Sequence, residues 1–505
     1  MKTGRNFVAG LANSIWTAAV GLAVVPFYLH YLGVASYGLI GFFTAMQAVF
    51  GLLEMGLSPT MNREVARSQS PDDRLRARDL LHTLACVYWL VAAGIGLCLF
   101  IAAPHVARVW LHSSTLSERD LAQAIALMGL IIACRFPLGL YLGALMGAQR
   151  MVLASGIEIA MTAVANLGAV AVLALGSATI QAFFGWQALV AVLNVIIVRA
   201  AAWRALGPSQ TRPQFDKAAL GRIWRFSAGM ALTAALGTVY LQSDKIVLSK
   251  LSSLSDLGIY SLAGLAARSL YLFLTPTFGA VYPRFTELSA ASETTTLVSL
   301  YRSGTRALMS AIWPITVFMS LFAPDIFHLW TRDYSISNSI SMTVTLLAFG
   351  TALNGAMHFP YALQLACGRS DLSAKINAAL LIPYILSLSL LTHKFGISGA
   401  AGAWVFYNTS YLVVGTAVTD RLLLKGVGLR WLSIDVALPF LSALLIAGGG
   451  GMWAQSLPLN QFARLSLGGV FASLAFFAVV GLSPDLRRSL HRRTLFNPAA
   501  IDRNS

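Results

Sequence analysis

Charged side chains are scarce in this chain. Asp, Glu, Lys and Arg make up 11% of its 505 residues, whereas hydrophobic residues make up 57%. Soluble domains have about 25% charged residues, so the composition excludes an ordinary soluble protein. Apolar runs of about 20 residues recur along the chain, and each is long enough to cross the roughly 30 Å hydrocarbon core of a bilayer. We therefore predict an all-α polytopic membrane protein with about 14 transmembrane helices.

Cysteine and the common catalytic motifs are also scarce or absent. The chain contains no G-x-x-x-x-G-K-[ST], H-E-x-x-H or G-x-S-x-G pattern, which argues against ATP hydrolysis and against an enzyme of these classes. Transport, if that is the function, would draw on an H⁺ or Na⁺ gradient, the membrane potential, the substrate gradient or a partner, and we expect no cofactor. The first apolar run, Phe7 to Leu29, is too long for a cleavable signal peptide. The four cysteines lie in or beside apolar segments without metal-ligand spacing, so they predict neither disulfides nor zinc: Cys86, Cys98, Cys134 and Cys367.

A weak internal repeat suggests two lobes. "YLGVASYGL" (31–39) resembles "LSDLGIYSL" (254–262), and "GAQRMVLASG" (147–156) resembles "ACGRSDLSAK" (366–375). Each pair is offset by roughly 220 residues, or six spans, which predicts two pseudo-symmetric six-helix lobes with a cavity between them. The last two spans follow a basic loop and could be dispensable additions. The expected parts are an N-terminal lobe (1–200), a cytoplasmic amphipathic linker (201–225), a C-terminal lobe (226–420), and two further spans with a basic cytoplasmic tail (421–505).

Basic residues set the expected orientation. The formal net charge is +16, but the Lys and Arg residues sit in short loops between spans, which indicates membrane orientation rather than nucleic-acid binding. With the N-terminus inside, most of them fall on the cytoplasmic side, so both termini are expected there. The longest expected loops are 200–225 and 284–306. "PQFDKAALGRIWRF" (213–226) alternates charged and apolar residues, which is typical of an amphipathic surface helix or of a solvated linker. The cytoplasmic clusters are Arg63, Arg67, Arg74, Arg76 and Arg78; Arg199, Arg204, Arg212, Lys217, Arg222 and Arg225; and Arg487, Arg488, Arg492 and Arg493.

A few ionisable residues fall inside the expected spans. A charge at mid-bilayer costs roughly 2.5–3.5 kcal/mol on the insertion scale, so each needs a partner or a wet cavity. Arg135 and Arg268 lie near the midplane of spans four and eight, and two guanidiniums facing one cavity would suit a phosphate group. Alternatively, Arg135 pairs with Glu158 as a structural ion pair. The full set is Glu54, Arg135, Glu158, Asp244, Lys245 and Arg268.

Other intramembrane residues leave alternatives open. Lys245 could line the cavity, or it could snorkel toward the outer surface with Asp244 capping it. His358 could relay protons or hydrogen-bond a backbone carbonyl. Glu54 is expected about one turn from the cytoplasmic end of span two, as an inner-gate or packing carboxylate. Arg63 and Arg67 would anchor the cytoplasmic mouth and could pair with Glu54 or Glu64.

Two stretches carry a family resemblance. Residues 31–67 contain Leu32-Gly33, Tyr37-Gly38, Glu54-Met55-Gly56-Leu57, Arg63-Glu64 and Arg67, and "QSDKIVLSKLSSLSDLGIYSLAGLAAR" (242–268) follows in the second half. In this order they resemble the bacterial polysaccharide transporter family, which includes O-antigen and exopolysaccharide flippases. The family belongs to the multidrug/oligosaccharidyl-lipid/polysaccharide flippase superfamily. It more often has Asp at the position of Glu54.

The resemblance implies a function. It implies alternating access in a bacterial inner membrane and a substrate of undecaprenyl diphosphate carrying an oligosaccharide repeat unit, moved from the inner to the outer leaflet. A polysaccharide polymerase and a chain-length regulator are the implied protein partners. Arg135, Arg268 and Lys245 would then contact the diphosphate, whereas Glu54, Glu158 and Asp244 are candidates for ion coupling or gating. A cation-coupled multidrug extruder and a membrane polysaccharide polymerase or ligase stay as alternatives, and no motif indicates which glycan is carried.

Overall fold

The computed structural model describes residues 2–54, 57–68, 70–207, 212–217, 221 and 237–483. These residues form helices joined by short turns, with one isolated β-bridge between His112 and Ser253. Ten described helices are long and apolar enough to span a membrane, or eleven if the bent pair Leu254–Arg268 and Tyr271–Ala290 is one span. The expected all-helical, multi-span class is confirmed.

Two of these long helices each contain two of the expected spans. The backbone of α1 (Lys2–Gly51) is non-helical at Gly33, where φ is 77°. That of α14 (Ser370–Leu422) is non-helical at Gly396, where φ is 57°. Glycine adopts this left-handed conformation without the Cβ penalty, so each helix can turn back there. Counted in this way, the described residues contain thirteen spans, and the helix 237–251 is the described part of the expected seventh.

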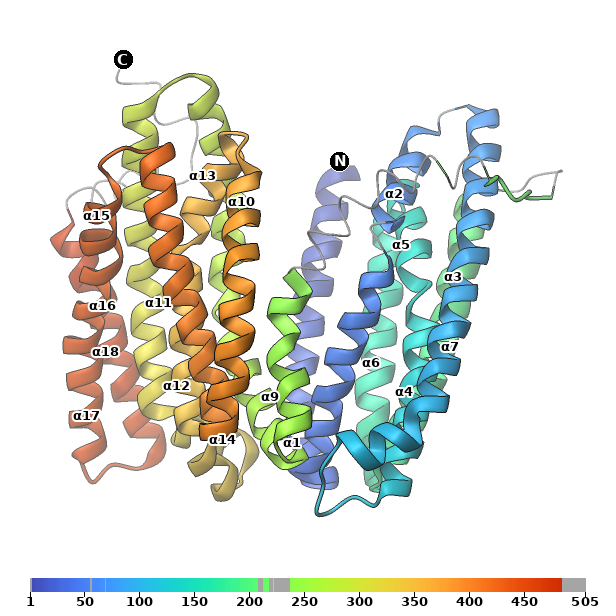
Figure 1. Cartoon of the computed structure of the whole chain (residues 1–505), viewed down its shortest axis with the longest axis horizontal. Coiled ribbons are helices and arrows are strands. Elements are labelled where there is room, and N and C mark those ends of the chain that lie inside the picture. The colour runs from blue at the N-terminus through green and yellow to red at the C-terminus, as the bar shows by residue number, and fades with distance from the viewer. Residues whose placement is uncertain are drawn as a thin grey trace. The chain divides into compact units, whose positions relative to one another are not determined.

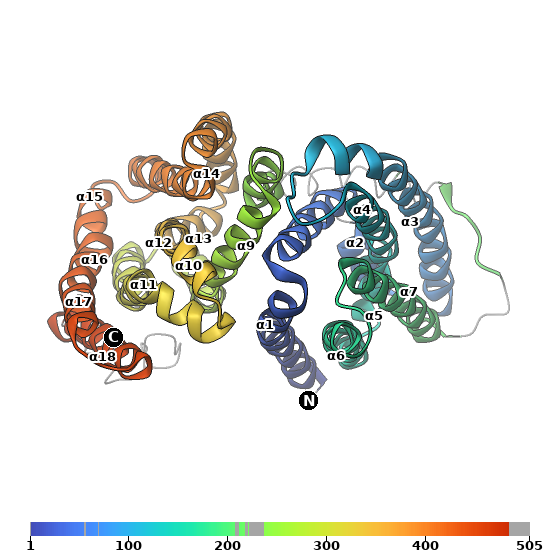
Figure 2. The same cartoon turned by 90° about the horizontal axis from the view of Figure 1, so that it is seen from below.

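The chain forms two compact units, Met1–Gly258 and Ile259–Ser505. In the first unit, α1 packs on α6 and α6 on α7, while α7 packs on α4 and α5. In addition, α4 packs on α3 and α5 on α2. The helices of each unit run side by side in Figure 1, and Figure 2 shows them nearly end-on. The first unit also contains the helix 237–251, so it extends beyond the 1–200 lobe; the predicted lobe boundaries remain a prediction. Its helices are α2 (Leu57–Arg67), α3 (Pro71–His105), α4 (Glu118–Arg135), α5 (Leu138–Gly147), α6 (Met151–Leu175) and α7 (Ile180–Ala205), and α9 (Leu254–Arg268) begins at its end.

The second unit is also entirely helical in its described part. Its helix α11 packs on α12 and on α18, α12 packs on α14, and α10 packs on α13. Two π-helical segments, Trp431–Ala437 and Ala443–Gly448, interrupt the helical path that runs from Gly428 to Ser456. The helices are α10 (Tyr271–Ala290), α11 (Thr294–Thr331), α12 (Tyr334–Ala356), α13 (His358–Ala366), α14, α15 (Gly428–Arg430), α16 (Leu438–Ser442), α17 (Gly449–Ser456) and α18 (Gln461–Leu482).

Several spans are broken near their middle. Span four changes from α4 to α5 at Phe136 and Pro137, span eight from α9 to α10 at Ser269 and Leu270, and span ten from α12 to α13 at Met357. Proline has no backbone N–H and cannot continue the hydrogen bonding of a preceding helix. Pro137 lies at the break in span four, and Pro360 lies in the first turn of α13, so prolines explain two of the three breaks. The predicted mid-membrane arginines, Arg135 and Arg268, are the last residues of α4 and α9.

The second pair of repeats adopts the same turn twice. Between α5 and α6, Gln149 has φ 56°, and the N–H of Arg150 donates to the carbonyl of Leu145. Between α13 and α14, Gly368 has φ 71°, and the N–H of Arg369 donates to the carbonyl of Gln364. Matched residues in matched local geometry support an internal duplication at this point of the chain.

The loop predictions need correction. The segment 284–306 is helical except for a short turn at Ala291–Glu293, because α10 and α11 extend through residues that their charge suggested were loop. In the stretch 213–226, residues 213–216 are not helical. They follow α3 instead, because the N–H of Gln214 donates to Asp79 (2.8 Å) and that of Asp216 to Thr83 (2.8 Å). Arg222 and Arg225 lie outside the described residues, as do all four arginines of the basic tail.

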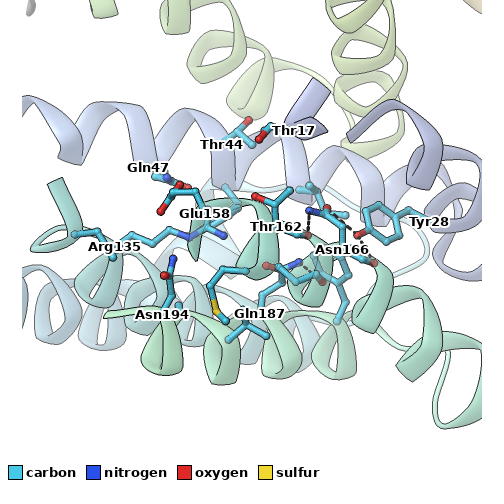
Figure 3. Close-up of a pocket in the computed structure, with 18 of the residues that line it drawn as sticks. Thr17, Tyr28, Thr44, Gln47, Arg135, Glu158, Thr162, Asn166, Gln187 and Asn194 are labelled. Atoms are coloured by element: carbon cyan, nitrogen blue, oxygen red, sulfur yellow. Dashed lines mark hydrogen bonds between the residues drawn. The ribbon is translucent and has the colours of Figure 1, made fainter. Parts of the chain in front are cut away.

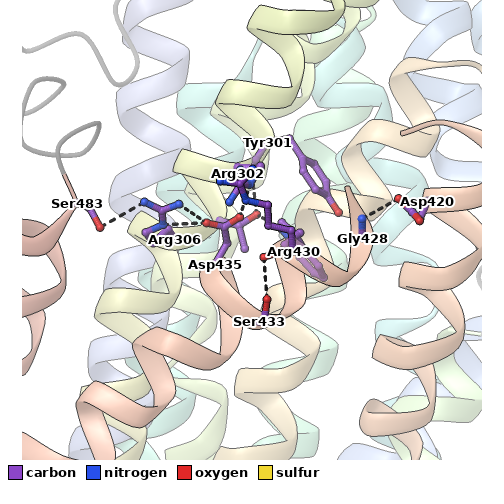
Figure 4. A network of polar contacts seen from close by, with 11 residues as sticks. Tyr301, Arg302, Arg306, Asp420, Gly428, Arg430, Ser433, Asp435 and Ser483 are labelled. Atoms are coloured by element: carbon purple, nitrogen blue, oxygen red, sulfur yellow. Dashed lines mark hydrogen bonds and ion pairs between the residues drawn. The ribbon is translucent and has the colours of Figure 1, made fainter. Parts of the chain in front are cut away.

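The two C-terminal spans are tied to the second unit by a buried ion cluster (Figure 4). The carboxylate of Asp435 is fully buried and accepts from Arg302 Nε at 2.7 Å and from Arg306 Nη2 at 2.5 Å. Trp431 Nε1 donates to the hydroxyl of Thr305 at 2.9 Å, which adds a buried polar contact between the same helices. The segment is thus built into the core of this unit.

Candidate substrate pocket in the N-terminal unit

A pocket of about 490 Å³ opens among α1, α4, α5, α6 and α7. Side chains far apart in the sequence meet there because these helices pack around one another (Figure 3). Nine of its nineteen lining residues are apolar, among them Phe43 and Phe183, and the other ten are polar or charged. The polar lining residues are Thr17, Tyr28, Thr44, Gln47, Arg135, Glu158, Thr162, Asn166, Gln187 and Asn194.

One end of the pocket, the charged end, is built around Arg135. Its guanidinium donates from Nη1 to Gln47 Oε1 at 2.9 Å and lies 5.7 Å from the centre of the Phe43 ring. Glu158 and Asn194 lie around the same guanidinium in Figure 3, and Arg135 and Glu158 interact electrostatically. The hydrogen-bond partner of Arg135 is thus the neutral amide of Gln47, and no ion pair within 4 Å joins the described side chains of Arg135 and Glu158. The structural ion pair that the sequence left open is therefore not formed.

The opposite end, the neutral end, consists of Tyr28, Thr162, Asn166 and Gln187 (Figure 3). Tyr28 Oη donates to Asn166 Oδ1 at 3.2 Å, and Asn166 Nδ2 donates to the backbone carbonyl of Thr162 at 2.9 Å. Gln187 Nε2 donates to the backbone carbonyl of Ala165 at 3.2 Å. These bonds fix the orientation of each amide at the pocket wall, so the neutral end is pre-organised.

Lys245 approaches the same pocket from the helix 237–251. Its side chain is buried, and Nζ lies 3.4 Å from the Thr44 hydroxyl, which lines the pocket. The snorkelling interpretation is therefore wrong, because the ammonium points into the unit. Asp244 does act locally: its Oδ1 accepts from the backbone N–H of Lys245 at 2.7 Å.

Arg268 belongs to the second unit. It is exposed and ends α9 at the break in span eight. Close by in the sequence, Tyr271 Oη donates to Asn354 Oδ1 at 3.1 Å, and His358 Nδ1 lies 3.2 Å from the backbone carbonyl of Asn354. The carbonyl contact is the simpler of the two interpretations of His358.

Glu54 is the last residue of the 3₁₀ turn Leu52–Glu54 and of the apolar segment Val8–Glu54, which is long enough to span a membrane. The helix α2 follows from Leu57 to Arg67, and the expected role of Glu54 near the inner end of span two remains a prediction. Glu54 lies against α5, where a Cβ built on Gly139 would come within 2.9 Å of Glu54 Oε1. Arg63 pairs with Glu64 at 3.0 Å, which is one of the two pairings expected at the mouth. Met55 and Gly56 of the family motif lie outside the described residues.

Sequence reasoning missed most of the pocket. It selected Arg135, Glu158 and Lys245 because a charge in an apolar run is conspicuous. Gln47, Asn166 and Gln187 carry no formal charge, and uncharged amides occur in many membrane helices. Helical spacing does place Glu158, Thr162 and Asn166 on one face of α6, four residues apart, which is a signal that could have indicated the wall.

With the geometry established, comparison with known proteins identifies the family. A family model described as "Polysaccharide biosynthesis protein" matches residues 4–289, which is more than half of the chain. The chain belongs to this family. A curated Shigella flexneri protein named "Putative O-antigen transporter" is 20% identical over 404 residues, covering 78% of this chain and 94% of that protein. The protein is thus a multi-pass membrane protein of a polysaccharide-biosynthesis family.

Solved structures show the same fold. The lipid II flippase MurJ, in an inward closed conformation, has a TM-score of 0.71 with 12% identity, covering 97% of this chain and all of that chain. An inward-facing multidrug resistance MATE family transporter of the MOP superfamily has a TM-score of 0.63 with 14% identity, covering 81% of this chain and 96% of that chain. The predicted superfamily resemblance is confirmed at the level of fold.

Proposed function

We propose that this family member is a flippase that moves undecaprenyl-diphosphate-linked oligosaccharide repeat units from the inner to the outer leaflet of a bacterial cytoplasmic membrane. Transport would proceed by alternating access and would supply O-antigen or exopolysaccharide synthesis. The observation that carries the proposal is the pocket of the N-terminal unit, where Arg135 keeps a neutral hydrogen-bond partner and Lys245 approaches from a second helix.

Two physical arguments support an anionic, lipid-linked substrate. A guanidinium inside a membrane helix is costly, so its presence there favours a functional role, and its planar fork matches a phosphate group. Gln47 orients the guanidinium through one N–H, and no ion pair with Glu158 occupies the planar fork in the described structure, so an incoming diphosphate can still bind to it. Arg268 is proposed as a further diphosphate contact in the second unit, and Glu54, Glu158 and Asp244 as carboxylates that couple an ion or act at a gate.

The test is the composition of the lipid-linked intermediates in a strain that lacks the protein. We expect single repeat units to accumulate on the inner leaflet, with loss of surface polymer that the wild-type gene restores. Arg135→Ala should fail to restore it, and Arg135→Lys should restore it only in part, because a point charge lacks the planar fork. Variant abundance in the membrane is the control.

Other outcomes identify other functions. Accumulation of repeat units on the outer leaflet would indicate a polymerase or ligase. Normal polymer together with hypersensitivity to organic cations would indicate a drug extruder. Full polymer with Arg135→Ala at normal abundance would contradict the diphosphate contact.

A further inference from the structure

We infer that the neutral end of the pocket is a sugar-binding subsite. Tyr28, Thr162, Asn166 and Gln187 would hold the sugar residue attached to the diphosphate and select among glycans. The inference rests on the proposed function and adds to it the part of the substrate that this region recognises.

Size is the first argument. At about 490 Å³ the pocket is as large as typical small-molecule sites, which run from roughly 300 to 1,000 Å³. Arg135 occupies one end, and the wall continues along α6 and α7 through Asn166 and Gln187 (Figure 3). A diphosphate contacting Arg135 would engage only the charged end, and a bulkier polar group is needed to fill the rest.

Charge is the second argument. The described lining residues include one cationic side chain, Arg135, and one anionic side chain, Glu158, so the formal charges of the lining sum to zero. A pocket devoted to a diphosphate alone would need a cationic excess along its length. The neutral end offers instead amides and hydroxyls, and each of these groups can both donate and accept, as sugar hydroxyls require.

Pre-organisation is the third argument. Gln187 is more than nine-tenths buried, and its Nε2 donates to the backbone carbonyl of Ala165, whereas its Oε1 accepts no hydrogen bond from the described residues. Asn166 is held from two sides, by Tyr28 and by the carbonyl of Thr162. The Tyr28 ring packs edge-to-face on Phe183 with centroids 5.0 Å apart, which fixes an apolar wall beside the amides. Such a wall suits the C–H face of a sugar ring, and the amides suit its hydroxyls.

A site built to hydrogen-bond hydroxyls discriminates strongly, because a wrong ligand leaves buried polar groups unpaired. The neutral end therefore has the chemistry to distinguish sugars that differ in one hydroxyl or acetamido group. The charged end would treat all diphosphate carriers alike.

The experiment uses the purified full-length chain in proteoliposomes. Binding is compared for bare undecaprenyl diphosphate and for the same lipid carrying one hexose or one N-acetylhexosamine. Asn166→Ala and Gln187→Ala should each weaken binding of at least one sugar-bearing lipid about tenfold, the loss of roughly one buried hydrogen bond. Both variants should leave bare undecaprenyl diphosphate unchanged. The matched control is Gln123→Ala, because Gln123 is exposed on α4 and does not line the pocket.

The ratio of the two affinities keeps the test informative if a variant folds poorly, since loss of active protein lowers both signals equally. Arg135→Ala should weaken all lipids together. Equal losses for bare and sugar-bearing lipids, or no loss in the Asn166 and Gln187 variants, would overturn the sugar subsite and leave the flippase intact. If the wild-type protein binds none of these lipids but binds an organic cation such as rhodamine 6G, the proposed function fails as well.

Discussion

Asp435→Asn should lower the free energy of unfolding by about 3 kcal/mol, the lower end of the range for breaking a buried ion pair. The Asp435 carboxylate has no exposed surface, and it accepts from Arg302 Nε at 2.7 Å and from Arg306 Nε at 2.8 Å and Nη2 at 2.5 Å. Asn keeps the size but removes the charge, so two partly buried guanidiniums lose their counter-ion.

The magnitude follows from the burial of the two arginines. Removing one partner of a fully buried pair costs about 3–5 kcal/mol, because an uncompensated charge remains in a low dielectric. Arg302 and Arg306 keep 20% and 12% of their side-chain surface exposed, so water can partly replace the carboxylate. The expected cost is therefore at the lower end of that range.

The assay is thermal unfolding of the detergent-solubilised protein, followed by tryptophan fluorescence. The matched control is Asp371→Asn, because Asp371 forms exposed pairs with Arg369 at 3.1 Å and with Lys375 at 2.8 Å. Exposed pairs contribute little, so this variant should unfold at the wild-type temperature. Equal unfolding temperatures for the two variants would refute the argument that the Asp435 cluster fastens the C-terminal spans.

Three further predictions concern packing, a buried hydrogen bond and topology. Gly38→Ala should destabilise the protein by about 1–3 kcal/mol, because the new Cβ would lie 1.9 Å from the backbone oxygen of Leu254. The control Gly94→Ala should unfold at the wild-type temperature, because no atom lies within 4 Å of its new Cβ. Equal unfolding temperatures for the two variants would contradict this prediction. Trp431→Phe should lower the free energy of unfolding by roughly 1–3 kcal/mol, because the Thr305 hydroxyl loses the buried indole N–H that donates to it at 2.9 Å. An unchanged unfolding temperature in the same assay would show that this hydrogen bond contributes nothing to stability. Single cysteines placed near either terminus of a cysteine-free variant should react with an impermeant thiol reagent only after cell lysis, because the distribution of basic residues predicts that both termini are cytoplasmic. Labelling in intact cells would indicate the opposite orientation.

Hydropathy predicted the helical class and most span positions, because each run of apolar residues reports directly on burial in lipid. It could not locate helix ends. The segment 284–306 shows why: α10 and α11 continue as helices through charged residues, and hydropathy reports the solvent around a helix rather than the helix itself.

The candidate pocket was predictable only in its charged residues. Arg135 and Glu158 were selected because an unpaired charge in a membrane span is costly. Which group Arg135 contacts depends on how α1 packs on α6 and how α4 packs on α7, and no local pattern contains that information. Gln47 is the clearest example, since it becomes significant only when its carbonyl oxygen is found 2.9 Å from Arg135.

The most direct test of the central claim is transbilayer movement in proteoliposomes that contain the purified protein and fluorescently labelled undecaprenyl-diphosphate oligosaccharide. A membrane-impermeant glycosidase reports the fraction of substrate on the outer face over time. We predict that wild-type protein makes essentially all of the substrate accessible, and that Arg135→Ala leaves the inner-leaflet half protected. Continued protection of that half with the wild-type protein, under an imposed H⁺ or Na⁺ gradient of either direction, would contradict the account.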